Sequence, residues 1–138
     1  MYNCQTNLIT HLATGFSSPT VRTIKAYAGE LRDASKVTEI VPAILVLYDD
    51  GEPISQEKYH NFEIIILTES RVLDKVTNQE NNLALSSQVA AWLKANPTFL
   101  KSGGGTYYVH PEKMHARTGA ITDRFAVVLL KTTIEDRT

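Results

Sequence analysis

The stretch VPAILVLYDDGEP, residues Val41 to Pro53, decides the fold because it contains the clearest buried strand of the chain. Six of its first seven residues are apolar, which is too short a run for a helix and too uniform for a strand with one face in water. A second strand is predicted over residues 57–70, where Ile64–Leu67 would cover both faces. The segment GEPISQ between them is short enough for a hairpin loop.

Spacing of apolar residues and of turn residues places the other elements around this pair. Helices are predicted over residues 2–13, 30–40 and 82–97, and further strands over residues 20–29, 106–110 and 124–134. Only some neighbouring strands are separated by a helix, so we expect a mixed or antiparallel sheet. The predicted fold class is α+β, a single domain over residues 1–138 with its helices packed on one face of the sheet.

Composition limits the classes of protein that the chain can represent. Its 138 residues suit one domain, and the single cysteine, Cys4, rules out an intramolecular disulfide and a multi-cysteine zinc site. A net charge of −1 gives no general electrostatic reason to bind nucleic acid. The N-terminus has no basic leader, and no window approaches the ~20 apolar residues that span a bilayer. We therefore expect a soluble cytoplasmic protein with no membrane contact.

The two halves of the chain carry opposite net charges. Residues 1–69 hold five Lys or Arg against nine Asp or Glu, and residues 70–138 hold nine against six. Chance scatter over one surface is the simpler interpretation. The alternative is a surface of two signs that suits head-to-tail self-association.

Asp49, Asp50 and Glu52 follow the buried strand and form the first candidate site. Three acids at a strand end can bind a divalent cation or supply an acid and a base. The sequence DDG is also ordinary turn chemistry, since Asp bonds back to the chain and Gly adopts a positive φ. No further acids follow at the spacing of a calcium loop, so we predict a turn rather than a metal site.

The segment KSGGGTYY, residues 101–108, forms the second candidate site. Successive glycine amides can bind an anion, but a P-loop needs Gly-Lys-Ser/Thr opening a helix, and here the lysine comes first and a strand follows. We instead expect Lys101, Gly103, Gly104 and Gly105 to form a loop that orders against a partner. Tyr107 and Tyr108 would point to opposite faces of a strand, leaving one as an interface aromatic, for which we select Tyr107.

The remaining reactive side chains show no catalytic spacing. His110, Glu112 and His115 match none of the established zinc patterns. Cys4 lies on the apolar stripe of the first predicted helix and Trp92 on that of the last, and both are expected in the core. We predict no cofactor, no metal and no enzymatic activity.

Two sequence motifs resemble those of a known family. KAYAGEL, residues Lys25 to Leu31, is followed about ten residues later by VPAILVLYDDGEP. The chain resembles the gene-product-37 family of small tail proteins of Mu-like phages and prophages, whose members have a strand ending in Tyr-Gly/Ala-Gly-Glu-Leu and a Pro-Ala-hydrophobic strand ending in Tyr. Tyr27–Leu31, then Pro42, Ala43 and Tyr48, occupy these positions here. The motifs that carry the resemblance cover about residues 27–51.

The resemblance implies a tail terminator. Similar proteins are thought to assemble as a hexameric ring on the end of the tail tube, where they stop tube growth and meet the head connector or neck protein. It also implies a location in the host cytoplasm during assembly and in the virion tail afterwards. The family has no known enzymatic residues, so none is carried over.

Two other functions stay open at this point. One is a neck or baseplate adaptor with the same fold. The other is a small metal-dependent hydrolase that uses Asp49, Asp50 and His60.

Overall fold

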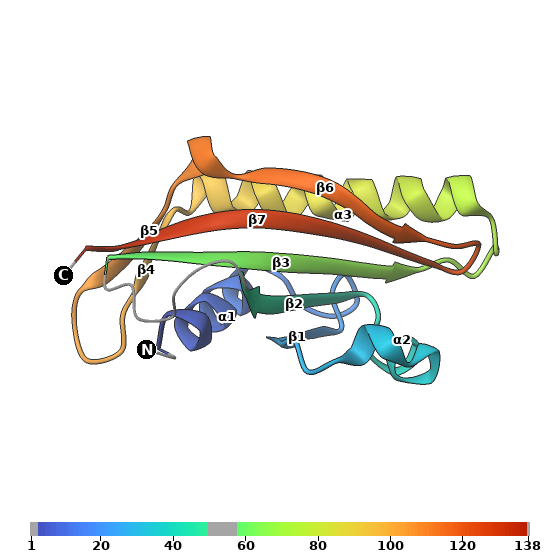
Figure 1. Ribbon diagram of the computed structural model, residues 1–138, viewed down its shortest axis with the longest axis horizontal. Helices are drawn as coiled ribbons and strands as arrows, with labels where there is room; N and C mark the ends of the chain where they lie inside the picture. Colours follow the sequence, from blue (N-terminus) through green and yellow to red (C-terminus); the bar gives the residue numbers. More distant parts are fainter. Residues whose placement is uncertain (1–2, 50–57, 138) are drawn as a thin grey trace.

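The computed structural model describes residues 3–49 and 58–137. One sheet, with helices against it, runs through this part of the chain (Figure 1). The elements are α1 (Asn3–Gly15), β1 (Thr23–Ala26), the 3-10 helix η1 (Glu30–Arg32), α2 (Ala34–Ile40), β2 (Ala43–Tyr48), β3 (Tyr59–Glu69), α3 (Lys75–Ala95), β4 (Thr98–Leu100), β5 (Thr106–Val109), the 3-10 helix η2 (Pro111–Lys113), β6 (His115–Ile121) and β7 (Phe125–Arg137).

Within the described residues, the sheet is mixed and has seven strands. Its order is β1-β2-β3-β7-β5-β4, and β6 also pairs with β7. Of the strand pairs that the structure describes, only β1 with β2 is parallel, and the others are antiparallel. The predicted α+β class and the predicted mixed sheet are therefore confirmed. The long strand β7 pairs with β3 from Phe125 to Glu135, and its other edge is shared between β6 and β5.

The apolar run that begins at Val41 contains an inner strand. β2 pairs with β1 on one side and with β3 on the other, and Ala43–Val46 are buried on both faces. Ile44 and Val46 enter one core cluster, while Ala43 and Leu45 enter another on the opposite face. A strand covered on both faces has no place for alternating polar residues, which explains its unbroken apolar sequence.

The helices cover both faces, which corrects part of the prediction. α1 and α3 pack on one face through their apolar stripes, which consist of Cys4, Leu8 and Leu12, and of Leu85, Val89 and Leu93. The short helix α2 packs on the other face, where Val37 and the following Val41 contact the cluster of Leu45 and Leu67. The expectation of helices on one face holds for the two long helices only, because the sheet buries apolar residues on both faces.

Three segments differ from the predicted elements. α3 begins at Lys75 rather than at residue 82, with the Asp74 carboxylate accepting from the Val76 N–H as its N-terminal cap. β4 and β6 lie in segments where no strand was predicted. β4 is an edge strand of three residues that exposes Leu100, and β6 is an edge strand with exposed polar side chains such as Arg117 and Thr118, so neither has the apolar alternation that marks a half-buried strand.

No helix in the two described stretches is long and apolar enough to cross a membrane.

Different connections lie at the two ends of the sheet (Figure 1). The β4–β5 turn and the start of β3 lie at one end, and the connection from β3 to α3 lies at the other.

Candidate functional site

The acidic turn after β2 is described only at its first residue. The Asp49 carboxylate lies 3.2 Å from the Lys131 ammonium of β7, and the Asp49 N–H donates to the carbonyl of Asn61. Asp50 and Glu52 lie outside the described residues. The predicted turn at these three acids therefore stays a prediction, and Asp49 has a cationic partner within the chain.

The glycine loop forms the tight connection between β4 and β5. Gly103, Gly104 and Gly105 all have positive φ, between 89° and 112°, a conformation that residues with a Cβ rarely adopt. Two hydrogen bonds close the turn, from Lys101 N–H to the Gly105 carbonyl and from Gly104 N–H to the Lys101 carbonyl. The Lys101 ammonium makes a 2.6 Å ion pair with Asp136 on β7, which fixes the base of the turn against the sheet.

Tyr107 is placed differently from the prediction. Its side chain is only 2% exposed, and its ring packs 5.3 Å from that of Phe99 in the core. Burial raises the pKa of the Tyr107 phenol to about 12. Its neighbour Tyr108 is half-buried, with the Arg137 guanidinium 3.8 Å from the ring centre. The adjacent tyrosines do face opposite sides, but Tyr107 is the buried one and cannot act as an exposed interface aromatic.

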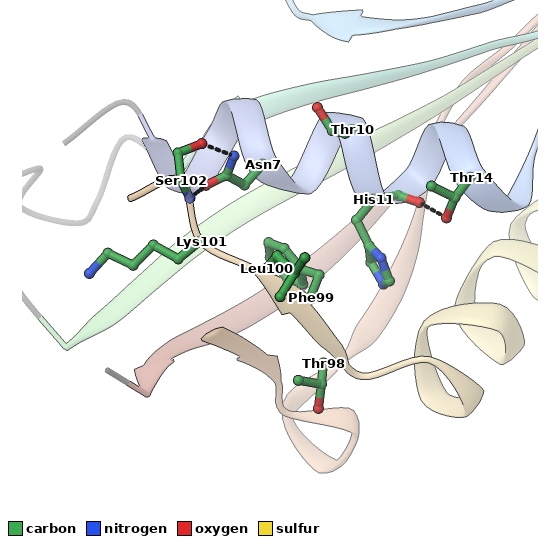
Figure 2. Close-up of a pocket in the computed structure, with 9 residues that line it drawn as sticks. All are labelled: Asn7, Thr10, His11, Thr14, Thr98, Phe99, Leu100, Lys101 and Ser102. Atoms are coloured by element: carbon green, nitrogen blue, oxygen red, sulfur yellow. Dashed lines mark hydrogen bonds between the residues drawn. The ribbon is translucent and has the colours of Figure 1, made fainter. Parts of the chain in front are cut away.

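A cleft of about 540 Å³ lies between α1 and β4 (Figure 2). Its lining residues come from two short segments: Asn7, Thr10, His11 and Thr14 of α1, and Thr98–Ser102 at and after β4. The four α1 residues follow helical spacing and form one polar stripe. Leu100 is 79% exposed beside this cleft, more than the other large apolar side chains of the described chain. We call this site the α1–β4 groove.

Side chains of α1 join both ends of β4 across this groove. The His11 imidazole bonds through Nε2 to the Asn96 carbonyl at 2.8 Å. At the other end, Asn7 donates to the Ser102 hydroxyl and accepts from the Ser102 N–H, at 2.7 and 2.9 Å. The His11 ring also contacts Trp92, with ring centres 4.6 Å apart. Burial lowers the pKa of His11, so the folded chain favours the neutral ring with Nε2–H donating.

A second exposed apolar feature lies where β3 connects to α3. Val72, Leu73 and Val76 are 71%, 60% and 62% exposed within five residues of chain. Leu73 has a positive φ of 55°, which is uncommon for a residue with a side chain. We call these three residues the apolar cluster. It lies at the opposite end of the sheet from the α1–β4 groove (Figure 1).

The buried titratable side chains serve the core. Cys4 is fully buried, as predicted, and burial raises its thiol pKa to about 12, so the reactive thiolate does not form near neutral pH.

Burial also lowers the pKa of His60. His60 lies on the same face of the sheet as Phe62. Asp49 contacts Lys131 and lies on the opposite face. Asp49 and His60 therefore cannot share one bound ion.

His110 is held by two carboxylates. Its Nδ1 lies 2.7 Å from Glu112 and its Nε2 lies 2.7 Å from Glu135. His115 is an exposed residue at the start of β6. Within residues 3–49 and 58–137, no group of three or more His, Cys, Asp or Glu side chains is placed to hold a metal ion. His110 instead joins η2 to β7.

Sequence reasoning did not find the groove, although a signal was present. Asn7, His11 and Thr14 are polar residues at helical spacing, on one side of the apolar stripe of Leu8 and Leu12.

Comparison with known protein families, with characterised proteins and with solved structures finds no match to the chain. The groove and the apolar cluster offer exposed apolar side chains and backbone hydrogen-bonding groups, which suit binding to another protein.

Proposed function

We propose that this chain is a structural protein of a phage or prophage tail, a tail terminator that forms a hexameric ring on the end of the tail tube. In this proposal the ring stops tube growth and presents its free face to the head connector. The protein acts in the host cytoplasm during assembly and stays in the virion tail. The resemblance of residues 27–51 to tail proteins of Mu-like phages supplies the class of assembly.

One observation carries the structural part of this proposal: within the described residues, large exposed apolar side chains lie at both ends of the sheet. The apolar cluster exposes Val72, Leu73 and Val76, and the α1–β4 groove exposes Leu100. Contiguous exposed apolar surface marks contact with other proteins. A ring subunit needs unlike surfaces, because head-to-tail contacts join one patch to a different patch. We assign the groove to neighbouring copies and the apolar cluster to the tube or the connector.

The alternatives receive less support. An adaptor of the neck or baseplate would use the same two surfaces, and capping of the tube end distinguishes it from a terminator. A hydrolase built on Asp49, Asp50 and His60 is disfavoured because Asp49 and His60 lie on opposite faces of the sheet. Asp50 lies outside the described residues.

Solution mass tests self-association directly. We expect light scattering over a concentration series to show growth toward a six-subunit species, with rings in negative-stain images. The tube protein of the same phage or prophage, polymerised in the presence of the chain, should give shorter capped tubes. A chain that stays monomeric throughout and leaves tube length unchanged would contradict the proposal.

A matched pair of variants tests whether the apolar cluster contacts the tube, independently of folding. Val76→Asp places a carboxylate in the first turn of α3, where the helix dipole favours it, so stability is retained. Gln79→Glu adds the same charge at another exposed α3 position as the control. We expect Val76→Asp alone to abolish tube capping. Equal capping by both variants would remove the apolar cluster from the tube contact.

A further inference from the structure

The backbone of β4 presents unused hydrogen-bonding groups to the α1–β4 groove. Val109 N–H donates to the Pro97 carbonyl, and Lys101 N–H donates to the Gly105 carbonyl. Antiparallel strands alternate between residues that bond to a given neighbour and residues that do not. Residues 97, 99 and 101 therefore bond to β5, and the N–H and C=O groups of Thr98 and Leu100 point away from β5.

The two ends of this free edge already have partners from α1. The Asn96 carbonyl is bonded to His11, and the Ser102 N–H is bonded to Asn7. Both belong to the same outward-facing set as Thr98 and Leu100. Between them, the backbone groups of Thr98 and Leu100 have no partner within the described residues. The open centre coincides with the 540 Å³ cleft (Figure 2).

We propose that the α1–β4 groove receives the edge strand β6 of a second copy of this chain, which adds to β4 and extends the sheet between subunits. This inference rests on the self-association in the proposed function and names the two surfaces that meet. An extended backbone supplies alternating donors and acceptors at the spacing that Thr98 and Leu100 need. The exposed Leu100 side chain would then be covered by the incoming strand.

The chain itself contains the matching strand. β6 pairs with β7 along one side, and within the described chain no strand covers its other side. Its residues 115–118 are exposed. Ala116 and Thr118 share one face, so a strand entering beside α1 can turn small side chains toward the helix. The parallel edge strand β1 is shorter, with four residues against seven, and α1 packs against it.

Cross-linking between two variants, each with one added cysteine, tests this contact. Leu100→Cys and Ala116→Cys are purified separately with tags of different size, mixed at ring-forming concentration and treated with a short bis-maleimide. Cys4 is fully buried and does not compete. We expect a mixed dimer for this pair and none when Leu100→Cys meets Arg71→Cys, an exposed site at the far end. Rings without this mixed dimer would overturn the inference and leave the proposed function standing.

A proline substitution tests the backbone groups that face the groove. Thr98→Pro removes an N–H that faces the groove, and edge strands tolerate proline where the N–H faces away from the sheet. Thr98→Ala is the matched control because it keeps the N–H. We expect Thr98→Pro to weaken self-association by at least about fivefold relative to the control, since one hydrogen bond is lost and the edge is blocked. Equal association of the two variants would overturn the inference.

A third outcome separates the two proposals. If the unmodified chain never self-associates, with or without tail tubes, then the inference fails together with the ring. The melting temperatures of both proline-test variants accompany each measurement, so that loss of association is assigned to the groove only where folding is intact. The cross-linking result decides the case if Thr98→Pro does not fold.

Discussion

The His11 imidazole is stacked on the Phe99 ring, with ring centres 4.9 Å apart and planes inclined by 15°. This contact joins α1 to β4 at the floor of the α1–β4 groove. Aromatic pairs contribute about 0.5–1.5 kcal/mol beyond the area they bury. The stack, together with the His11 bond to the Asn96 carbonyl, holds the helix at a fixed distance from the edge strand.

This placement of His11 predicts a pH dependence of stability. Burial lowers its pKa below the ordinary 6.5, so the folded chain holds fewer protons than the unfolded chain between the two pKa values. The contribution of His11 to the free energy of unfolding is then complete above pH 6.5 and is lost as the pH falls below it. We expect the melting temperature to fall on acidification, and His11→Gln to flatten this slope. Part of the slope remains, because burial also lowers the pKa of His60.

The control for this prediction is Thr10→Gln, which alters the same polar stripe and keeps the His11 ring. Its melting temperature should follow pH as the unmodified chain does. An unchanged slope in His11→Gln would show that the His11 ring does not carry the effect.

The close approach of Gly15 to Trp92 predicts a size limit at the end of α1. A Cβ on Gly15 would overlap the indole ring of Trp92. Alanine is favoured over glycine in a helix by up to about 1 kcal/mol, but overpacking costs about 1–3 kcal/mol, so we expect Gly15→Ala to destabilise the chain. Urea denaturation of Gly15→Ala, Trp92→Leu and the double variant measures the coupling. The cost of Gly15→Ala should shrink in the Trp92→Leu background, and simple additivity would contradict the contact.

The parts of the fold that follow apolar patterning were predictable from sequence, and the start of α3 shows why others were not. Its buried stripe includes Asn78 and Asn82 before it reaches Leu85. Both asparagines donate to backbone carbonyls, Asn78 to Thr122 in the β6–β7 turn and Asn82 to Ile66 and Ala126 in the sheet. A helix that contacts the sheet through amides lacks the apolar periodicity on which the prediction depended.

The candidate site was less predictable than the fold. Lys101 and the three glycines were found because their chemistry demands a turn. The groove depends on which edge of β4 is left unpaired, and that follows from the register with β5 rather than from residue types. Tyr107 was misassigned for the same reason, since alternation shows that two adjacent residues face opposite sides but not which side is the core.

The hydrogen bonds of Asn82 predict that a negative charge at this position strongly destabilises the folded chain. Its amide nitrogen lies within 3.0 Å of the Ile66 carbonyl, the Thr68 hydroxyl and the Ala126 carbonyl, and the residue is 1% exposed. Asn82→Asp would set a buried carboxylate against carbonyl oxygens, at a cost of about 3–5 kcal/mol. We expect a large drop in the urea midpoint near neutral pH.

The neighbouring residue provides the control for this substitution. Asn81→Asp makes the same change at an exposed position one residue away and should shift the midpoint little. The Asn82→Asp variant should also recover relative to Asn81→Asp as the pH falls, because a protonated carboxyl can donate to a carbonyl. Similar midpoints for the two variants would contradict the assigned hydrogen bonds.

The ion pair between Lys101 and Asp136 predicts that the turn beside the groove depends on a partly buried charge. The two side chains are 22% and 15% exposed, and Asp136 Oδ1 is buried without a hydrogen-bond partner among the described residues. Lys101→Met leaves the Asp136 carboxylate without its cation and should cost about 1–3 kcal/mol. Lys94→Met, at an exposed position on α3, should change stability by less than about 0.5 kcal/mol.

A double-variant cycle separates loss of the ion pair from loss of packing. Asp136→Asn removes the uncompensated charge, so stability in the Lys101→Met background should rise when it is added, although Asp136→Asn alone is destabilising. Urea denaturation of the four chains gives the coupling free energy, which is positive only if the charges interact in the folded state. If Asp136→Asn lowers stability equally in both backgrounds, then the pair does not hold the turn, and the groove must be fixed by the Asn7 and His11 bonds alone.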